Sequence, residues 1–427
     1  MKGPPRNRLL TASFYMLGFW TLFPQAVVSW MAVEDILSGT LLPSTVVLFS
    51  YSIADLFSKS LSPFIVRKIS FNVSFCLATS LFVGSLLLLV AIDDIKLRIA
   101  GVTVMGIAYG FTRITDVSLL AYYENADILA NALENGGTAS VFLASIVYTG
   151  LTTWLCVAPC FAIAACIPLC LIPLAIYLSL DKEPLKDHLR QTTDHQPIQY
   201  AILTDEELSD EQETPEAVPS LSKVLFLFKA LPIMGYNFIS STCCHVSVAS
   251  VLSTLTFPSS PFLPRDHYQY YRLLSDSGML FGGLLILVVS CFGEKCMEFF
   301  RIRKLWSLVT LNVIILLFFV FASWYRFLPN VIFVLVLCFV QGLLHGVTIV
   351  YCAQNIASLY SSPRDKGTAL SLLQVSFSCS RLAAASLGFF VEPYLREHCT
   401  YRLMLGRFCL ARHAAHGEWG TNKHCRI

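Results

Sequence analysis

A run of 46 consecutive residues, Asn135–Leu180, contains no Asp, Glu, Lys or Arg. A second uncharged run, Phe71–Ile92, covers 22 residues. About 20 apolar residues in a helix cross the hydrocarbon core of a bilayer, and a helix satisfies its backbone polar groups within the segment. The two runs therefore predict membrane-spanning helices, and they exclude a soluble multidomain enzyme.

The composition agrees with this prediction. Of the 427 residues, 55% are hydrophobic and 14% are charged, against about 25% charged in soluble domains. The net charge of +2 comes with no basic block, so the lipid bilayer is expected as a partner and nucleic acid is not. The fifteen cysteines match no metal or redox spacing, and those in or beside apolar runs are interpreted as buried thiols. These are Cys76, Cys156, Cys160, Cys166, Cys170, Cys291, Cys338, Cys352 and Cys379.

Apolar runs bounded by charge predict eleven spans, so the expected fold class is an all-α integral membrane protein. The approximate limits of the spans are Leu9–Val33, Leu41–Val66, Phe71–Ile92, Leu97–Tyr123, Gly136–Leu155, Cys160–Leu180, Ile233–Phe257, Leu273–Phe292, Leu305–Trp324, Phe327–Ala357 and Gly367–Val391.

One long polar stretch separates the sixth span from the seventh. Residues 181–222 contain eleven acids, three bases and four prolines, a composition typical of a disordered linker. We therefore expect an N-terminal six-helix half (1–180), an acidic linker (181–223), a C-terminal five-helix half (224–391) and a divergent tail (392–427).

The placement of basic residues indicates the orientation, because Lys and Arg favour cytosolic loops. Lys2, Arg6 and Arg8 precede the first span and predict a cytosolic N-terminus. Six spans later, the linker is also expected in the cytosol. An odd number of spans places the tail on the lumenal side, although the tail is basic.

A glycine pattern repeats in the two halves. Gly106 and Gly110 in the fourth span correspond to Gly342 and Gly346 in the tenth, which is the fourth span of its own half. Glycines four residues apart let two helices approach closely, so these four residues are predicted to pack helices. The correspondence favours two pseudo-repeated halves, as in the major facilitator architecture, with chance similarity as the alternative.

A few polar side chains fall at membrane depth, where they are costly and usually face an interior pathway. Asp55 and Lys59 are four residues apart and Arg113 and Asp116 are three apart, so each pair can meet on one helix face. His345 suits a proton relay, because histidine titrates near the pH of an acidic lumen. The full set of candidate substrate-pathway residues is Asp55, Lys59, Arg113, Asp116, Gln341, His345, Asn355 and Arg381.

Each candidate has a purely structural alternative, such as a self-neutralising pair, a snorkelling arginine or a hydrogen-bonded histidine. The sequence contains no hydrolase, metalloprotease or nucleotide-binding motif. Because the intramembrane acids stand beside bases, a conduit for a small-molecule substrate is favoured over an enzyme. No metal or other cofactor is expected.

The linker carries one short motif. Tyr200-Ala201-Ile202-Leu203 has the tyrosine-x-x-bulky form that clathrin adaptors read as an extended peptide. Tyr200 and Leu203 are therefore candidates for an endolysosomal sorting signal.

Several short motifs, in order, make the chain resemble the battenin family over most of residues 9–390. They are Asp35-Ile36-Leu37, Lys59-x-Leu61-x-Pro63, Tyr268-Gln269-Tyr270-Tyr271-Arg272, Phe300-Arg301-Ile302-Arg303, Phe327-Leu328-Pro329, Gln341-Gly342-Leu343-Leu344 and Gln354-Asn355-Ile356-Ala357. The resemblance implies a lysosomal or vacuolar membrane protein with a major-facilitator-like fold. It also implies export of glycerophosphodiesters, transport of basic amino acids, or a role in organelle pH homeostasis.

The chain departs from the family pattern at several charged positions. The resemblance implies glutamates where this chain has Arg113, Tyr236 and Gln341, and an aspartate where it has Phe377. We therefore expect a battenin-like transporter in which Arg113 and Arg381 attract an anionic group such as glycerophosphate. The alternatives are an equilibrative nucleoside-type facilitator and a non-transporting membrane scaffold that acts in lysosomal trafficking through its linker.

Overall fold

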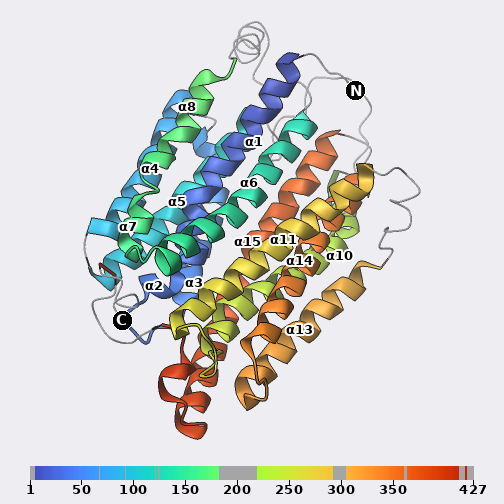
Figure 1. Cartoon of the computed structure of the whole chain (residues 1–427). Helices are drawn as coiled ribbons and strands as arrows, with labels where there is room; N and C mark the ends of the chain where they lie inside the picture. The colour runs from blue at the N-terminus through green and yellow to red at the C-terminus, as the bar shows by residue number, and fades with distance from the viewer. Residues whose placement is uncertain are drawn as a thin grey trace, which may run out of the picture.

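The computed structural model describes residues 5–66, 68–91, 93–120, 122–123, 126–181, 219–291, 304–359, 363–412 and 419–420. All regular structure within these ranges is helical. The linker motif at Tyr200 and Leu203 lies outside the described residues. The predicted all-helical fold is confirmed, and each of the eleven predicted spans coincides with a long helical segment (Figure 1).

Two groups of helices lie side by side (Figure 1). The N-terminal half contains α1 (Pro5–Ala26), α2 (Val33–Ile36), α3 (Thr45–Val66), α4 (Phe71–Ala91), α5 (Ile95–Leu120), α6 (Ala126–Thr149), α7 (Pro159–Ala164) and α8 (Ile172–Ser179). The C-terminal half contains α10 (Pro219–Val246), α11 (Pro264–Cys291), α13 (Leu305–Tyr325), α14 (Val331–Leu359) and α15 (Pro363–Glu397).

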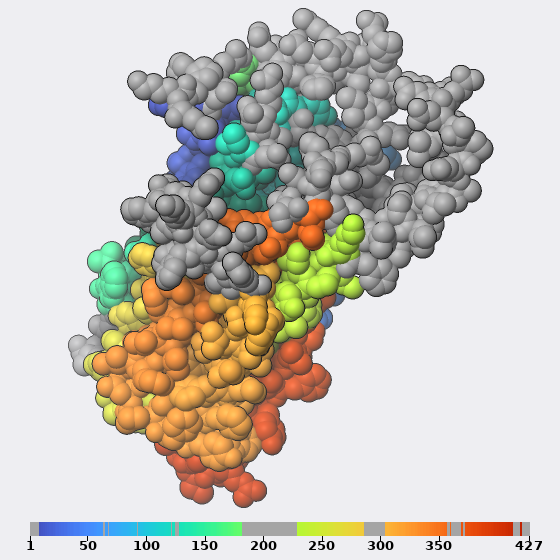
Figure 2. Space-filling view, turned by 90° about the vertical axis from the view of Figure 1, so that its right-hand side faces the viewer, coloured from blue at the N-terminus to red at the C-terminus, as the bar shows by residue number. Residues whose placement is uncertain are grey.

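Helix composition follows position in the bundle. In the described chain, five helical segments are long and apolar enough to cross a membrane: α4, α5, the α7–α8 segment, α13 and α14. Three of these, α4, α8 and α13, lie at the outer edges of the two halves (Figure 1). Figure 2 shows α13 and α14 covering the outer surface of the C-terminal half. Helices such as α3, α11 and α15 instead hold buried charged side chains, which lower their hydropathy.

The two ends of the bundle differ. At one end α8 finishes and α10 begins, so we call it the linker end. At the other end α15 continues into a short π-helix (His398–Arg402) and a 3₁₀ turn (Gly406–Cys409), and we call it the tail end. The tail therefore folds against the bundle and contains a disulfide between Cys399 and Cys409.

The interpretation of Cys156 as a buried thiol is wrong, because this residue is disulfide-bonded. Cys156 lies in the turn between the π-helix Gly150–Trp154 and α7, with a φ of 57°. A side chain in a turn at the membrane surface is exposed to the adjoining compartment, whereas a side chain inside the bilayer is not. The other cysteines of that set whose side chains are described are free thiols: Cys76, Cys160, Cys166, Cys170, Cys338, Cys352 and Cys379.

Helix pairing follows the same order in both halves. In each half the first span packs against the fifth and the second against the fourth, giving α1–α6 and α3–α5, then α10–α15 and α11–α14. The halves meet through α3 against α15 and α6 against α11. This arrangement agrees with the pseudo-repeat that the glycine pattern predicts.

The glycine pairs lie where the second and fourth spans cross. A Cβ at Gly106 would lie 2.4 Å from the Tyr51 carbonyl oxygen, and one at Gly342 would lie 1.9 Å from that of Ser275. Gly110 and Gly346 face the backbone of the same partner helices one turn further along. Only a residue without a side chain allows this approach.

We expect Gly342→Ala to destabilise the C-terminal half, because the added methyl group meets the Ser275 backbone and α11 and α14 must separate. Overpacking of this kind costs about 1–3 kcal/mol or more. Thermal unfolding of the detergent-solubilised protein measures the effect. Gly283→Ala, on α11, is the matched control, since a Cβ there has nothing within 4 Å. Equal melting temperatures for the two variants would contradict the assignment.

Candidate functional site

A buried carboxylate joins the two halves near the middle of the bundle. Oδ2 of Asp55 on α3 accepts hydrogen bonds from Lys59 Nζ at 3.0 Å, Ser378 Oγ at 3.0 Å and Arg381 Nη2 at 2.9 Å. Asp55 is fully buried. The ion pair expected within α3 is present, and it extends to Arg381 on α15. We call Asp55, Lys59, Ser378 and Arg381 the central cluster.

Two tyrosines cover the cations of the central cluster. The Arg381 guanidinium lies 5.4 Å from the Tyr51 ring centroid, and Lys59 Nζ lies 5.3 Å from that of Tyr109. These are cation–π distances. Because two cations share one carboxylate, the cluster has one surplus positive charge. Among the described residues, Asp55 Oδ1 and Arg381 Nε have no hydrogen-bond partner, so one acceptor and one donor remain available.

A second ion pair lies within α11, the second span of its half. Arg272 Nε and Nη2 each lie 3.0 Å from an Asp276 carboxylate oxygen. Ser145 on α6 donates a hydrogen bond to Asp276, which connects the pair to the other half. The sequence reasoning missed this pair, although its i, i+4 spacing is the signal that identified Asp55 and Lys59.

Arg113 and Asp116 do not pair as their spacing suggested. Arg113 on α5 forms an ion pair with Glu134 on the neighbouring helix α6. Asp116 is fully buried, and neither carboxylate oxygen has a hydrogen-bond partner in the part of the chain that the structure describes. An ionised carboxylate in that position would lack the hydrogen bonds that normally offset its desolvation cost.

The candidates on α14 lie inside the C-terminal half and not in the central cluster. His345 Nδ1 is 3.4 Å from Ser240 Oγ on α10, and its ring lies 6.3 Å from that of His245. Gln341 Nε2 donates to Ser247 Oγ at 2.8 Å. Asn355 donates to the Tyr351 carbonyl of its own helix at 2.8 Å.

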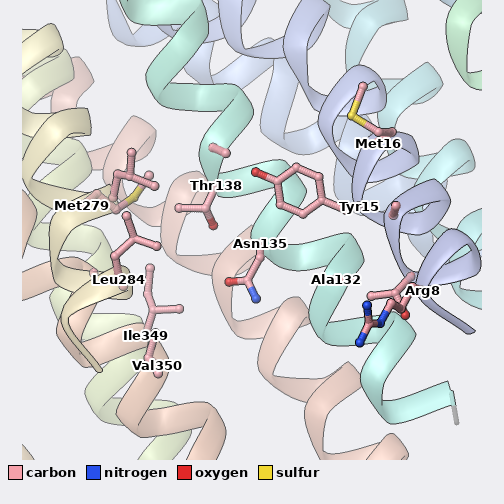
Figure 3. Close-up of a pocket in the computed structure, with 16 residues that line it drawn as sticks. Arg8, Tyr15, Met16, Ala132, Asn135, Thr138, Met279, Leu284, Ile349 and Val350 are labelled. Atoms are coloured by element: carbon pink, nitrogen blue, oxygen red, sulfur yellow. The ribbon is translucent and has the colours of Figure 1, made fainter. Parts of the chain in front are cut away.

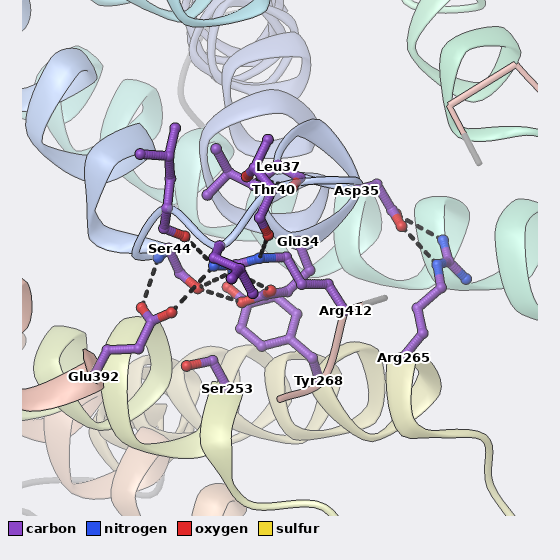
Figure 4. A network of polar contacts seen from close by, with 12 residues as sticks. Glu34, Asp35, Leu37, Thr40, Ser44, Ser253, Arg265, Tyr268, Glu392 and Arg412 are labelled. Carbon is purple, nitrogen blue, oxygen red and sulfur yellow. Dashed lines mark hydrogen bonds and ion pairs between the residues drawn. The ribbon is translucent and has the colours of Figure 1, made fainter. Parts of the chain in front are cut away.

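At the tail end, an ion pair between Asp35 and Arg265 closes the gap between the halves (Figure 4). Arg265 Nε and Nη2 each lie 2.6 Å from an Asp35 oxygen, and Tyr148 donates to the same carboxylate at 2.7 Å. Such bidentate pairs are the stronger and geometrically stricter kind of ion pair. Both partners are buried and 230 residues apart in sequence, and local sequence reasoning did not predict their contact.

A tail arginine forms a second closing contact beside the first (Figure 4). Arg412 Nη1 lies 2.7 Å from Glu34 Oε2, and Nη2 lies 3.3 Å from Glu392 Oε1. Ser44 bonds both carboxylates, through Oγ to Glu34 and through its backbone N–H to Glu392, each at 2.6 Å. Burial lowers the pKa of the Arg412 guanidinium, but the two carboxylates outweigh burial and raise it above its usual value.

The tail is attached at further points on both halves. The Ala411 N–H donates to the Ser253 carbonyl at 2.7 Å, and the Cys160 N–H donates to the Trp419 carbonyl at 3.3 Å. The Arg98 guanidinium lies 4.3 Å from the Trp419 ring. The tail therefore crosses from α15 to the N-terminal half.

A cavity of about 1070 Å³ lies between the halves toward the linker end (Figure 3). Its lining comes from α1 and α6 on one side and α11 and α14 on the other, and most of it is apolar. The lining includes Arg8, Tyr15, Met16, Asn135, Thr138, Met279, Leu284, Ile349 and Val350. Polar contacts thus join the halves at the centre and the tail end, while space remains toward the linker end.

Comparison with solved structures gives transporters of the major facilitator type. A D-xylose-proton symporter matches with a TM-score of 0.57 and 12% identity, covering 97% of this chain and 96% of that one. The nucleoside transporter NupG gives 0.53 and 16% over 98% and 94%. A bacterial homolog of the human lysosomal transporter Spinster gives 0.53 and 14% over 95% and 86%. At these identities the matches establish the fold.

Comparison of sequences identifies the family. The model of the family described as CLN3 protein matches residues 12–226 and 247–398. Protein BTN1 of Kluyveromyces lactis is 24% identical over 92% of this chain and 96% of its own length. Battenin of Canis lupus familiaris is 25% identical over 64% of this chain and 60% of its own. The chain therefore belongs to the battenin (CLN3 protein) family of multi-pass, transporter-like membrane proteins.

Proposed function

We propose that this chain is an endolysosomal or vacuolar transporter that moves small polar metabolites by alternating access. The anionic group of the substrate binds at the central cluster. The observation that carries the proposal is the surplus positive charge of Asp55, Lys59 and Arg381, held between α3 and α15 where the two halves meet.

The chemistry of the cluster favours glycerophosphodiesters. Their phosphate carries one negative charge, which matches the surplus cation, and guanidinium groups bind phosphate in a planar, two-point geometry. Their hydroxyl groups suit the unpartnered Asp55 Oδ1 and Arg381 Nε. Basic amino acids, the other substrate class implied for the family, fit less well because the surplus charge has the same sign.

The tail-end ion pairs suggest how access alternates. In the observed arrangement the Asp35–Arg265 and Glu34–Arg412–Glu392 contacts hold the tail end together. The cavity of Figure 3 lies on the linker side. Substrate that displaces Ser378 or Arg381 from Asp55 loosens the α3–α15 contact, which permits the halves to separate at the other end.

Three features support the location and the orientation. Disulfides form in oxidising compartments, so Cys399–Cys409 favours a lumenal tail end. The N-terminus and the linker then face the cytosol, as the basic residues before the first span predict. A cytosolic linker exposes Tyr200 and Leu203 to clathrin adaptors, which we propose sort the protein to endolysosomes.

We expect Arg381→Gln to reduce uptake of glycerophosphocholine into proteoliposomes by about 10-fold to 100-fold. The substrate phosphate loses a charged hydrogen-bond donor worth about 1.5–3 kcal/mol. Uptake of labelled substrate by equal amounts of folded protein is the measurement. Ser378→Ala, which keeps all charges of the cluster, is the matched control and should retain most of the flux. Unchanged flux in both Arg381→Gln and Arg113→Ala would refute the anionic substrate.

The same assay tests the nucleoside alternative, which the fold match to NupG favours. Nucleosides are uncharged, so their transport is insensitive to the loss of Arg381 and Arg113. Uridine uptake that survives both substitutions, together with an absence of glycerophosphocholine uptake, would support a nucleoside-type facilitator.

Deleting residues 194–216 of the linker separates transport from scaffolding. A transporter is expected to keep its flux in proteoliposomes after the deletion, because the central cluster lies outside this segment. In cells the deletion is expected to shift the protein from lysosomes to the cell surface, since Tyr200 and Leu203 are lost. Loss of lysosomal function by a correctly located deletion variant with normal flux would favour the scaffold.

Asp116 offers a proton-binding site that would link transport to organelle pH. Arg113, three residues away, is engaged by Glu134, and neither Asp116 oxygen accepts a hydrogen bond from a described residue. A buried carboxyl in these surroundings holds its proton, because the neutral form avoids the cost of an uncompensated charge. Release of Arg113 from Glu134 would give the ionised form of Asp116 a partner on its own helix.

We expect infrared spectra at neutral pH to contain the C=O stretch of a protonated carboxyl, and Asp116→Asn to remove it. Asp276→Asn is the matched control. Asp276 is similarly buried, but it forms an ion pair with Arg272 and is expected to be ionised. Its substitution should therefore leave the band of the protonated carboxyl unchanged. A band that persists in Asp116→Asn would exclude this residue as the proton site, whatever the transported substrate.

A further inference from the structure

Two buried carboxylates face each other across the boundary between the halves at the tail end. Glu34 lies on α2 of the N-terminal half and Glu392 near the end of α15 in the C-terminal half. They are 1% and 0% exposed. Ser44 bridges them, since its hydroxyl donates to one carboxylate and its backbone N–H to the other (Figure 4).

While both carboxylates are ionised, they stay together only with a cation between them. Like charges that share a site away from water repel strongly, and breaking a buried ion pair leaves an uncompensated charge. Among the described residues, Arg412 is the cation that forms ion pairs with both. Its planar guanidinium suits this position, because separate N–H groups reach the two carboxylates and Ser44 Oγ, the last at 2.8 Å.

The cation belongs to neither bundle of helices. Arg412 stands in the tail, just after the loop closed by the Cys399–Cys409 disulfide. Its guanidinium also contacts the loop before α3, donating from Nε to the Thr40 carbonyl at 3.3 Å and from Nη2 to the Leu42 carbonyl. The neighbouring Ala411 N–H anchors the same segment to Ser253. A segment outside the two helical bundles thus supplies the group that neutralises two carboxylates, one from each bundle.

We propose that Glu34, Ser44 and Glu392 form a guanidinium-binding site divided between the two halves, with Arg412 of the tail as its built-in occupant. Occupation holds the tail end shut. Withdrawal of Arg412 leaves two carboxylates that repel each other, so the tail end opens unless a soluble guanidinium takes its place. The consequence for access depends on the alternating-access mechanism proposed above, but the binding site itself does not.

A cysteine at position 253 reports on the closure. Ser253 is fully buried beside the site (Figure 4), and Ser253→Cys exchanges one small side chain for another. The measurement is the rate of labelling by a membrane-impermeant methanethiosulfonate reagent in nanodiscs, corrected for the parent protein without the added cysteine. We expect slow labelling with Arg412 present and an increase of about tenfold or more in Arg412→Ala.

Chemical rescue identifies the ligand class. Methylguanidinium chloride should restore protection to Arg412→Ala, and the same concentration of sodium chloride should not. Arg407→Ala is the matched control, because this exposed tail arginine stacks on Phe408, and it should label as slowly as the parent. If Arg412→Ala fails to fold, Arg412→Lys replaces it, with faster labelling expected because an ammonium cannot present the same fork of donors.

Two results would overturn the proposal. One is a labelling rate in the Arg412 variant equal to that of the parent. The other is protection restored equally by sodium chloride, which would show screening of charge without a guanidinium site. The assay uses no transport substrate, so it stands or fails independently of glycerophosphocholine uptake.

Discussion

The cost of holding charge away from water governs the interior of this protein. A helix that crosses a bilayer with Asp55 or Asp276 on it is stable only when a cation is close. In both cases the cation four residues away supplies part of the compensation, and a contact from the opposite half supplies more: Arg381 for Asp55, and the Ser145 hydroxyl for Asp276. The compensation of buried carboxylates thus accounts for two of the polar contacts that join the halves. Asp116 is the exception, because no described residue forms a hydrogen bond with its carboxylate oxygens.

The two halves are joined differently at the two ends of the bundle. Near the tail end the joining groups form ion pairs and hydrogen bonds, as in Asp35–Arg265 and the Arg412 site. Toward the linker end the halves are separated by a largely apolar cavity. A bundle whose halves are bonded at one end and separated toward the other resembles one of the two states of an alternating-access transporter. Under the proposed alternating-access mechanism, the opposite state loses the tail-end ion pairs, and substrate, protons or the tail itself would have to offset that loss.

Local features of the molecule were predictable from sequence and distant ones were not. Hydropathy is a property of a contiguous segment, so the spans were located, and the Asp55–Lys59 pair followed from helical spacing. The same spacing rule, applied to Arg272 and Asp276, would have found the second pair. It failed for Arg113, because Glu134 on a neighbouring helix competes for the guanidinium. No spacing rule connects Asp35 to Arg265 or Glu34 to Arg412, since the fold alone brings them together.

The glycine contacts have a mechanical consequence. At Gly106 and Gly342 the backbones of two helices touch directly, with no flexible side chain between them. Such a contact resists sliding and bending, so we expect the α3–α5 pair and the α11–α14 pair each to be rigid. The first pair carries the Asp55–Lys59 ion pair on α3, and the second carries the Arg272–Asp276 ion pair on α11. Motion between the halves is then expected along the α3–α15 and α6–α11 contacts, where a small rotation at the centre becomes a larger displacement at either membrane surface.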